Sequence, residues 1–219
     1  MSATAIADTK CDGTPKSQIE NDQRFCGRAV VITGAGGQFG RAGCLYFARR
    51  GCRVAALDVV PDALRETHEL LRQEIGSDLD FSAWACDVTS ADAVREVVQQ
   101  IVDRFGGDTI KYLWNNAGYQ GMFAKTLDYD PKDFSRVMEI NVTGQFIMLQ
   151  AVARQMIKAG VKGCSIVNTA SVAGMHCEQY SRIRGNAAED NRILHVTVHV
   201  AGSAHCLFRV IFVVLFLLL

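Results

Sequence analysis

The sequence predicts an α/β fold in which helices cover both faces of a parallel sheet. From Arg28 onward, short apolar runs alternate with amphipathic stretches of helical length, and parallel strands are usually joined by crossover helices in this way. A glycine-rich turn separates the first apolar run from the first amphipathic stretch. The chain has 219 residues, of which 49% are hydrophobic and 21% charged. This composition is typical of a folded domain, and at this length about 70% of the unfolded chain's surface can be buried.

Five short runs rich in aliphatic and β-branched residues are the expected strands. In chain order they are 29–33, 54–57, 81–86, 109–114 and 165–168. The first reads Ala-Val-Val-Ile-Thr, and such a continuous apolar run is typical of a strand buried on both faces of a sheet. The second is closed by Asp58, whose charge favours the end of a buried strand over its interior.

Four amphipathic stretches between these runs are the expected helices, at 38–50, 62–75, 91–105 and 133–158. In the first helix, the residues expected to face the sheet are Phe39, Ala42, Leu45, Tyr46 and Ala48. Gly51 follows that helix in the position of a C′ glycine, and Gly76 follows the second. Ser90 is the expected N-cap of the third helix. Each strand–helix–strand crossover is expected to be right-handed.

Charge and cysteine placement argue against three classes of protein. The 23 Lys and Arg residues balance the 23 Asp and Glu residues, whereas a nucleic-acid binder normally has a basic excess. The eight cysteines are scattered, with no Cys-x-x-Cys pair, so neither a zinc site nor a disulfide framework is indicated. Buried reduced thiols in an intracellular protein are expected instead.

The turn between the first strand and the first helix has the pattern of a phosphate-binding loop. It reads Thr33-Gly34-Ala35-Gly36-Gly37-Gln38-Phe39-Gly40. Glycines allow a sharp turn and a close approach of the backbone to a pyrophosphate, whose charge then meets the helix N-terminus. Gly40 allows the helix to pack closely on the strand. The alternative is a plain tight turn without a ligand.

Asp58 lies at the end of the second strand, 18 positions after Gly40. A carboxylate at this position can accept hydrogen bonds from the ribose hydroxyls of NAD and would repel the 2′-phosphate of NADP. No Arg or Lys directly follows Asp58 or occurs within the glycine turn. The expected cofactor is therefore NAD; the alternative is a solvated aspartate at a strand end.

Five elements, in this order along the chain, resemble the short-chain dehydrogenase/reductase family. Thr33, Gly34 and Gly40 match the family's glycine turn, although Gln38 stands where the family has a glycine. The other matching elements are Asp87-Val88, Asn115-Asn116-Ala117-Gly118, Asn141 within Ile-Asn-Val-Thr-Gly, and Ser171 within Asn-Thr-Ala-Ser-Val-Ala-Gly. The resemblance implies a Rossmann-type, doubly wound sheet with strand order 3-2-1-4-5.

The resemblance also implies roles for these residues. The expected cofactor-binding residues are Thr33, Gly34, Gly36, Gln38, Phe39, Gly40, Asp58, Asp87, Val88, Asn116, Ala117 and Gly118. Ser171 would polarise a substrate carbonyl and Asn141 would order a proton relay. The implied reaction moves a hydride between NAD(H) and a secondary alcohol or ketone, with that small molecule as the partner and a homo-oligomer as an allowed assembly.

The family's tyrosine–lysine pair does not match intact. In the family, a tyrosine follows the serine by about a dozen residues and a lysine follows the tyrosine by four. Here Tyr180 follows Ser171 by nine residues, Arg184 stands at the lysine position, and no lysine follows Lys162. Tyr180 is the expected acid/base residue if the chemistry survives. The alternative is a catalytically inactive dinucleotide-binding or dimer-partner protein from a truncated or frameshifted gene product.

The end of the chain departs from the strand–helix rhythm and closes with ten consecutive apolar residues from Val210. Missing family strands and helices would leave a five-stranded sheet with the fifth strand as an exposed edge. The apolar run could pack on the uncovered sheet, act as a membrane anchor, or be non-native sequence prone to aggregation. The expected division is a flexible tail at 1–25, a dinucleotide-binding domain at 26–175 and a non-family apolar segment at 176–219. Residues 1–23 show no signal-peptide pattern, and a cytoplasmic location is expected.

Overall fold

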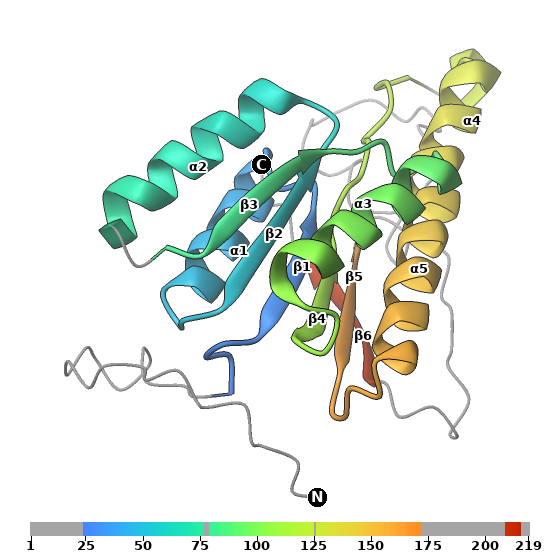
Figure 1. The fold of residues 1–219 in the computed structure, drawn as a ribbon. Helices are drawn as coiled ribbons and strands as arrows, with labels where there is room; N and C mark the ends of the chain where they lie inside the picture. The colour runs from blue at the N-terminus through green and yellow to red at the C-terminus, as the bar shows by residue number, and fades with distance from the viewer. Residues whose placement is uncertain (1–23, 77–78, 125, 172–208, 216–219) are drawn as a thin grey trace, which may run out of the picture.

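The computed structural model describes residues 24–76, 79–124, 126–171 and 209–215, which form a parallel sheet flanked by helices on both faces (Figure 1). The strands are β1 (Ala29–Thr33), β2 (Arg53–Asp58), β3 (Phe81–Ala85), β4 (Ile110–Asn115), β5 (Ser165–Ser171) and β6 (Arg209–Leu215). Their order across the sheet is β3-β2-β1-β4-β5-β6, and every pairing is parallel. The five predicted strands and the predicted order 3-2-1-4-5 are confirmed.

The helices lie between consecutive strands, as crossover connections require. They are α1 (Gln38–Ala48), α2 (Pro61–Ile75), α3 (Ala91–Phe105), α4 (Pro131–Met138) and α5 (Gln145–Lys158). Ser90 caps α3 as predicted, because its side chain accepts a hydrogen bond from Ala93 N. Gly51 and Gly76 both have positive φ, at 72° and 83°, which suits their positions after α1 and α2.

Two apolar cores lie on opposite faces of the sheet because successive side chains of a strand point to opposite sides. On one face, Val30 and Ile32 of β1 pack with apolar residues of α1 and α2. On the other face, Ala29 and Val31 belong to a core formed with α3 and α5. All five residues of β1 are buried. The central strand is therefore rigidly held, and its carboxyl end provides a fixed platform for the turn that follows.

The face of α1 that contacts the sheet matches the prediction at Leu45 and Ala48 and differs from it at Phe39 and Tyr46. The buried residues of α1 are Gly40, Gly43, Cys44 and Ala48, whereas Phe39 and Tyr46 are 40% and 47% exposed. The reason is close packing: a Cβ on Gly43 would lie 2.0 Å from the Trp114 ring. Small residues of α1 form its interface with the sheet, whereas a prediction from hydrophobicity alone placed large residues there.

The long helix predicted at 133–158 is interrupted. A short 3₁₀ turn at Thr126–Asp128 precedes α4, and a π-helical turn at Glu139–Gly144 separates α4 from α5. π-turns inside helices occur frequently at functional sites. Asn141, one of the predicted site residues, lies within this turn.

The predicted five-stranded sheet with an exposed fifth strand is wrong, because β6 pairs with β5 over seven residues from Ser165↔Arg209 to Ser171↔Leu215. The apolar run at the end of the chain supplies most of this strand. Its continuous aliphatic and β-branched pattern is typical of strands in parallel sheets that are covered on both faces. Among the helices that the structure describes, none is both long enough and apolar enough to span a membrane.

Among the cysteines that the structure describes, one departs from the prediction. Cys44, Cys52, Cys86 and Cys164 are free and buried, and burial raises the pKa of the Cys44 and Cys52 thiols to about 12. These thiols therefore stay protonated and unreactive. Cys26, by contrast, is disulfide-bonded. Scattered spacing alone gave no signal for that bond.

Candidate active site

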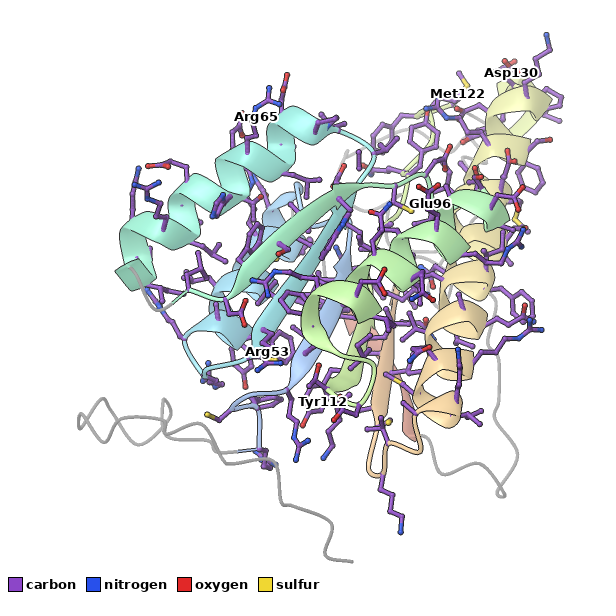
Figure 2. The ribbon with its side chains drawn as sticks, viewed as in Figure 1. Arg53, Arg65, Glu96, Tyr112, Met122 and Asp130 are labelled. Carbon is purple, nitrogen blue, oxygen red and sulfur yellow. The ribbon has the colours of Figure 1, made fainter. Side chains whose placement is uncertain are left out.

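The carboxyl ends of β1, β2 and β4 meet at one edge of the sheet, and most of the predicted site residues lie there. Figure 2 shows Met122 and Asp130, from the segment after β4, at the end of the molecule opposite Arg53 and Tyr112. Arg53 opens β2 and Tyr112 lies near the start of β4. Open parallel sheets bind their ligands outside the carboxyl ends of their strands.

The glycine turn is folded tightly against β2 and the start of α1. Gly34 has φ +65°, Gly37 N donates to Gly34 O at 3.1 Å, and Ala35 N donates to Leu57 O at 2.9 Å. A Cβ on Gly40 would lie 2.1 Å from Gly34 O. Glycine is therefore required at Gly40 for α1 to begin this close to the turn.

The first turn of α1 has the features of an anion-binding site. Gly37 is its N-cap, no side chain caps the helix, and no acidic residue lies in its first turn. The first N–H groups of a helix have no partners within the helix and carry the positive end of its dipole. Gln38 and Phe39 are both exposed at this end. The start of α1 therefore fits the pyrophosphate of a dinucleotide.

Asp58 connects the end of β2 to the glycine turn. Its Oδ2 accepts a hydrogen bond from Gly36 N at 2.9 Å, and its Oδ1 accepts one from Val60 N at 3.0 Å. A Cβ on Gly36 would lie 3.0 Å from Asp58 Oδ2 and 2.5 Å from the Ala63 Cβ. Each carboxylate oxygen keeps a further lone pair, so Asp58 can hold the turn and still accept hydrogen bonds from a ribose.

A hydrogen-bond network joins β1 to the segment after β4. Thr33 Oγ1 accepts from both Asn116 N and Ala117 N at 2.8 Å, and Asn116 Nδ2 donates to Thr33 O at 3.3 Å. A Cβ on Gly34 would lie 3.0 Å from the Ala117 Cα. The predicted residues Thr33, Asn116 and Ala117 are therefore in direct contact, and they fix one wall of the site.

Asn115 is buried at the centre of this network. Its Nδ2 donates to Gln145 O at 2.7 Å and to Asn168 Oδ1 at 3.1 Å, and its Oδ1 accepts from Thr33 Oγ1 at 3.3 Å. One side chain thus connects β1, β4, β5 and the first residue of α5. The role of Asn115 here is structural, because a buried side-chain amide needs hydrogen-bond partners of this kind.

Asp87 and Val88 lie after β3, where both side chains are engaged within the protein. Asp87 Oδ1 accepts from Thr89 N at 2.9 Å and from Thr89 Oγ1 at 2.8 Å. Val88 is buried, and a Cβ on Gly144 would lie 2.8 Å from its Cγ2. Asp87 remains exposed and keeps Oδ2 for a ligand.

Asn141 uses its whole side chain to hold the segment after β4. Its Oδ1 accepts from Tyr119 N at 2.7 Å and its Nδ2 donates to Tyr119 O at 2.8 Å. A Cβ on Gly118 would lie 3.4 Å from Asn141 Oδ1. Gly118 and Asn141 are therefore adjacent, and Asn141 positions the backbone of Tyr119.

The predicted catalytic residues are only partly placed. Ser171 ends β5, where its backbone pairs with Leu215 of β6. This end of β5 lies at the same edge of the sheet as the ends of β1 and β4, because the pairings are parallel. Tyr180 and Arg184 lie outside the described residues.

A carboxylate bound by two tyrosines, one of which is the Tyr119 that Asn141 holds, was not anticipated from the sequence. Asp133 accepts hydrogen bonds from the Tyr119 and Tyr129 hydroxyls, each at 2.8 Å, and its Oδ2 also accepts from Met122 N at 2.8 Å. These bonds hold the pKa of Asp133 below its usual value, led by the one from Met122. The hydrogen bond to Asp133 raises the pKa of Tyr119, and burial followed by the same carboxylate raises that of Tyr129.

The only sequence signal for this cluster is weak. Tyr119 directly follows the Asn-Asn-Ala-Gly element, and Asp133 lies in the first turn of a helix. Nothing in that spacing indicates that three residues from two segments meet. Within the described residues, no group of three or more His, Cys, Asp or Glu side chains could hold a metal ion.

Comparison with known proteins gives a consistent picture. The family model described as short chain dehydrogenase matches residues 28–182. The chain is 37% identical over 155 residues to sorbitol dehydrogenase from Cereibacter sphaeroides, covering 71% of this chain and 57% of that protein. It is 34% identical to (+)-borneol dehydrogenase 2 from Salvia officinalis, covering 73% of this chain and 56% of that protein. The chain therefore spans a little over half the length of these relatives.

Solved structures agree with the fold. The chain is 44% identical to NAD⁺-bound xylitol dehydrogenase, with a TM-score of 0.64 over 69% of this chain and 56% of that one. It is 32% identical to a short chain dehydrogenase/reductase from Burkholderia phymatum in complex with NAD, with a TM-score of 0.63 over 69% of this chain and 52% of that one.

Proposed function

Because the chain belongs to the short-chain dehydrogenase family, we propose that it binds NAD(H), in preference to NADP(H), at the carboxyl edge of its sheet. The observation that carries this proposal is the contact between Asp58 Oδ2 and Gly36 N. It puts a carboxylate against the turn that leads into the uncapped start of α1. Asp58 would accept hydrogen bonds from the adenosine ribose, and its charge would oppose a 2′-phosphate.

The other predicted residues surround the same turn. The first amides of α1, at Gln38 and Phe39, would bind the pyrophosphate. Thr33, Asn116 and Ala117 fix the wall next to the turn. Gly118 and the Asp87–Val88 segment would complete the site, on the pattern that the family resemblance implies.

The proposed reaction class is the interconversion of a secondary alcohol and a ketone. A nicotinamide bound here would supply the hydride or accept it. Ser171, at the end of β5, would polarise the substrate oxygen with its hydroxyl, and Tyr180 would exchange the proton. Asn141 acts through Tyr119, because both of its polar side-chain atoms bind that residue's backbone. The relatives' names, sorbitol and borneol dehydrogenase, support an alcohol or ketone substrate.

A titration with the two reduced cofactors tests the binding proposal. We expect the full chain to bind NADH more tightly than NADPH, measured by cofactor fluorescence. Asp58→Asn removes the charge and should narrow the gap between the two dissociation constants. Asp62→Asn removes a nearby exposed charge that pairs with Arg65 and should leave the gap unchanged. Equal affinities of the unmodified protein for both cofactors would contradict the role of Asp58.

A second candidate function is cofactor binding without turnover. The observation that favours it is Arg184 at the position of the family's lysine, with no lysine after Lys162. A tyrosine with an ordinary pKa near 10 needs a nearby cation to work near neutral pH, and Arg does not replace the compact ammonium group of Lys. Loss of a general acid typically lowers a rate by about 10²–10⁴-fold.

Assays of secondary alcohols with NAD, and of ketones with NADH, distinguish the two candidates. We expect NADH binding with little or no turnover. Substantial turnover that Tyr180→Phe abolishes would instead establish an active dehydrogenase and reject the inactive form.

A further inference from the structure

An ion pair between α1 and α2 lies beside the proposed adenosine site. Arg41 Nη2 is 2.5 Å from Glu66 Oε2 and 3.5 Å from Ala63 O. Ala63 is also the residue whose side chain a Cβ on Gly36 would meet first, at 2.5 Å, and the same Cβ would lie 3.0 Å from Asp58 Oδ2. Ala63 therefore contacts the Arg41 guanidinium through its carbonyl oxygen and lies against Gly36, whose N–H binds the carboxylate proposed to bind ribose.

Arg41 is held in place by more than its ionic partner. Its Nη2 also donates to Ala63 O at 3.5 Å, and its Nε is buried without a hydrogen-bond partner among the described residues. Thr67 Oγ1 lies 3.0 Å from Ala35 O and 2.9 Å from Ala63 O, and its one hydrogen is shared between the two carbonyls. This contact holds α2 against the glycine turn independently of the ion pair. The cation should thus stay near the turn when its partner is neutralised.

Glu66 contributes charge here more than stability. Its side chain is 66% exposed, and exposed ion pairs contribute little to the free energy of unfolding. The field of a charge nevertheless acts over several ångströms at the edge of a binding site. When Glu66 is ionised, its charge balances that of Arg41, and Asp58 gives the three side chains a net negative charge. When Glu66 is neutral, the charges of Arg41 and Asp58 cancel and the net charge is zero.

We propose that Glu66 determines cofactor preference together with Asp58, by neutralising a cation that would otherwise attract the 2′-phosphate of NADP(H). The inference rests on the proposed binding of NAD(H) at Asp58 and adds a second acidic residue to its selectivity. Glu66 touches neither cofactor; it acts through Arg41.

The test compares two charge-neutral variants in the full chain. Glu66→Gln is expected to tighten NADPH binding about five- to tenfold and to change NADH binding less than about twofold. Glu74→Gln is the matched control, because Glu74 Oε2 pairs with Arg49 Nη2 at 2.6 Å between the same two helices, away from the glycine turn. It should change neither affinity. The gain of Glu66→Gln should shrink at high salt, as charge effects do.

A double variant identifies the cation. Adding Arg41→Gln to Glu66→Gln should abolish the gain in NADPH affinity while NADH still binds. Unchanged NADPH affinity of Glu66→Gln, or an equal gain in Glu74→Gln, would overturn the role of Glu66 and leave NADH binding at Asp58 standing. Failure of the unmodified protein to bind NADH would overturn both the proposed function and this inference. Thermal melts of each variant check that all of them fold.

Discussion

At the scale of single residues, the candidate site depends on groups that shape the backbone as well as on groups that would touch a ligand. Asp58 both holds Gly36 through a hydrogen bond and presents a carboxylate. Asn141 is committed to the Tyr119 backbone. A substitution at either residue therefore changes the geometry of the site together with its chemistry.

Gly40 gives the sharpest prediction at this scale. A Cβ there would lie 2.1 Å from Gly34 O and 2.6 Å from Ala35 Cα, and this backbone cannot move without displacing the turn. Gly40→Ala is expected to lower the free energy of unfolding by about 2–3 kcal/mol, or the melting temperature by about 5–10 °C, and to abolish NADH binding.

Gly37→Ala is the matched control in the same turn. A Cβ on Gly37 would meet only Gly34 O, at 3.4 Å, and Gly37 has an ordinary negative φ of −78°. The melting temperature of the Gly37→Ala variant should match that of the unmodified protein. Equal losses in the two variants would show that close packing at Gly40 is not the cause.

Sequence patterns predicted residues that belong to a contiguous motif and missed those that meet only in space. The turn at 33–40 and Asp58 could be placed because each follows directly from a strand end. Asp133 could not be placed from the sequence, because the folded course of the loop is what brings Tyr119 and Met122 to it. The same limit applies to Glu66, which lies 25 positions from Arg41.

At the scale of elements, the segment between β4 and α4 is held at two points. Asn141 binds its start at Tyr119, and Asp133 binds Tyr119, Tyr129 and Met122 farther along. Arg136 also lies over the Tyr119 ring, 4.7 Å from its centroid. Both residues that hold the loop come from the α4–α5 region, so the π-turn and the loop form one unit.

The pKa shifts in this unit predict its pH dependence. The pKa of Asp133 is lowered by its hydrogen bonds, so its contribution to stability is present above its unfolded pKa, near 4, and is lost as the pH falls through the lower folded value. The pKa values of Tyr119 and Tyr129 are raised. Their contribution is present below pH about 10 and is lost as the pH rises through the higher folded values.

Asp133→Asn tests this behaviour. It removes the charge that both phenols face, so the pKa values of Tyr119 and Tyr129 should fall toward 10, measured by tyrosinate absorbance during an alkaline titration. Asp128→Asn, an exposed residue of the same segment, should leave the titration unchanged. An unaltered titration of Asp133→Asn would show that the carboxylate does not control the two phenols.

The short turn before β1 is a second element with a measurable role. Phe25 packs against Phe47 and Tyr112, with ring centroids 5.3 and 5.2 Å apart, and Tyr112 donates its hydroxyl hydrogen to Arg24 O at 2.9 Å. Phe25→Ala should lower the free energy of unfolding by about 2 kcal/mol, seen as a fall of about 4–8 °C in melting temperature. Phe123→Ala, which removes a 70% exposed ring, should change it little. No fall for Phe25→Ala would mean that the aromatic cluster adds nothing to stability.

At the scale of the whole molecule, the periodicity of the chain predicted most of the sheet because the physics of its strands is local. Continuous apolar runs fit strands covered on both faces, and helix-length amphipathic stretches fit the crossovers between them. Two of the departures from the prediction arose where the local sequence pattern does not decide the structure. The inward face of α1 is set by the close approach of Gly43 to Trp114, and the assignment of residues 209–215 depends on a partner strand, β5.

The pairing of β6 with β5 makes the final prediction, which concerns the integrity of the sheet. β6 covers the whole length of β5, from Ser165 to Ser171, so its removal would turn β5 into an open edge with unpaired N–H and C=O groups, a template for pairing with other chains. A chain ending at residue 208 is expected to melt roughly 5 °C or more below the full chain and to elute from a size-exclusion column as larger assemblies.

A chain ending at residue 215 keeps the strand and is the matched control, since it lacks only the last four residues of the sequence. If the chain ending at 208 melted and eluted like that control, the β5–β6 pairing would contribute nothing to the folded protein, and the five-stranded sheet would be sufficient. NADH titration of both chains adds an independent readout. Because the glycine turn follows β1, two strands away from β5, we expect the loss of β6 to lower the melting temperature more than the affinity for NADH.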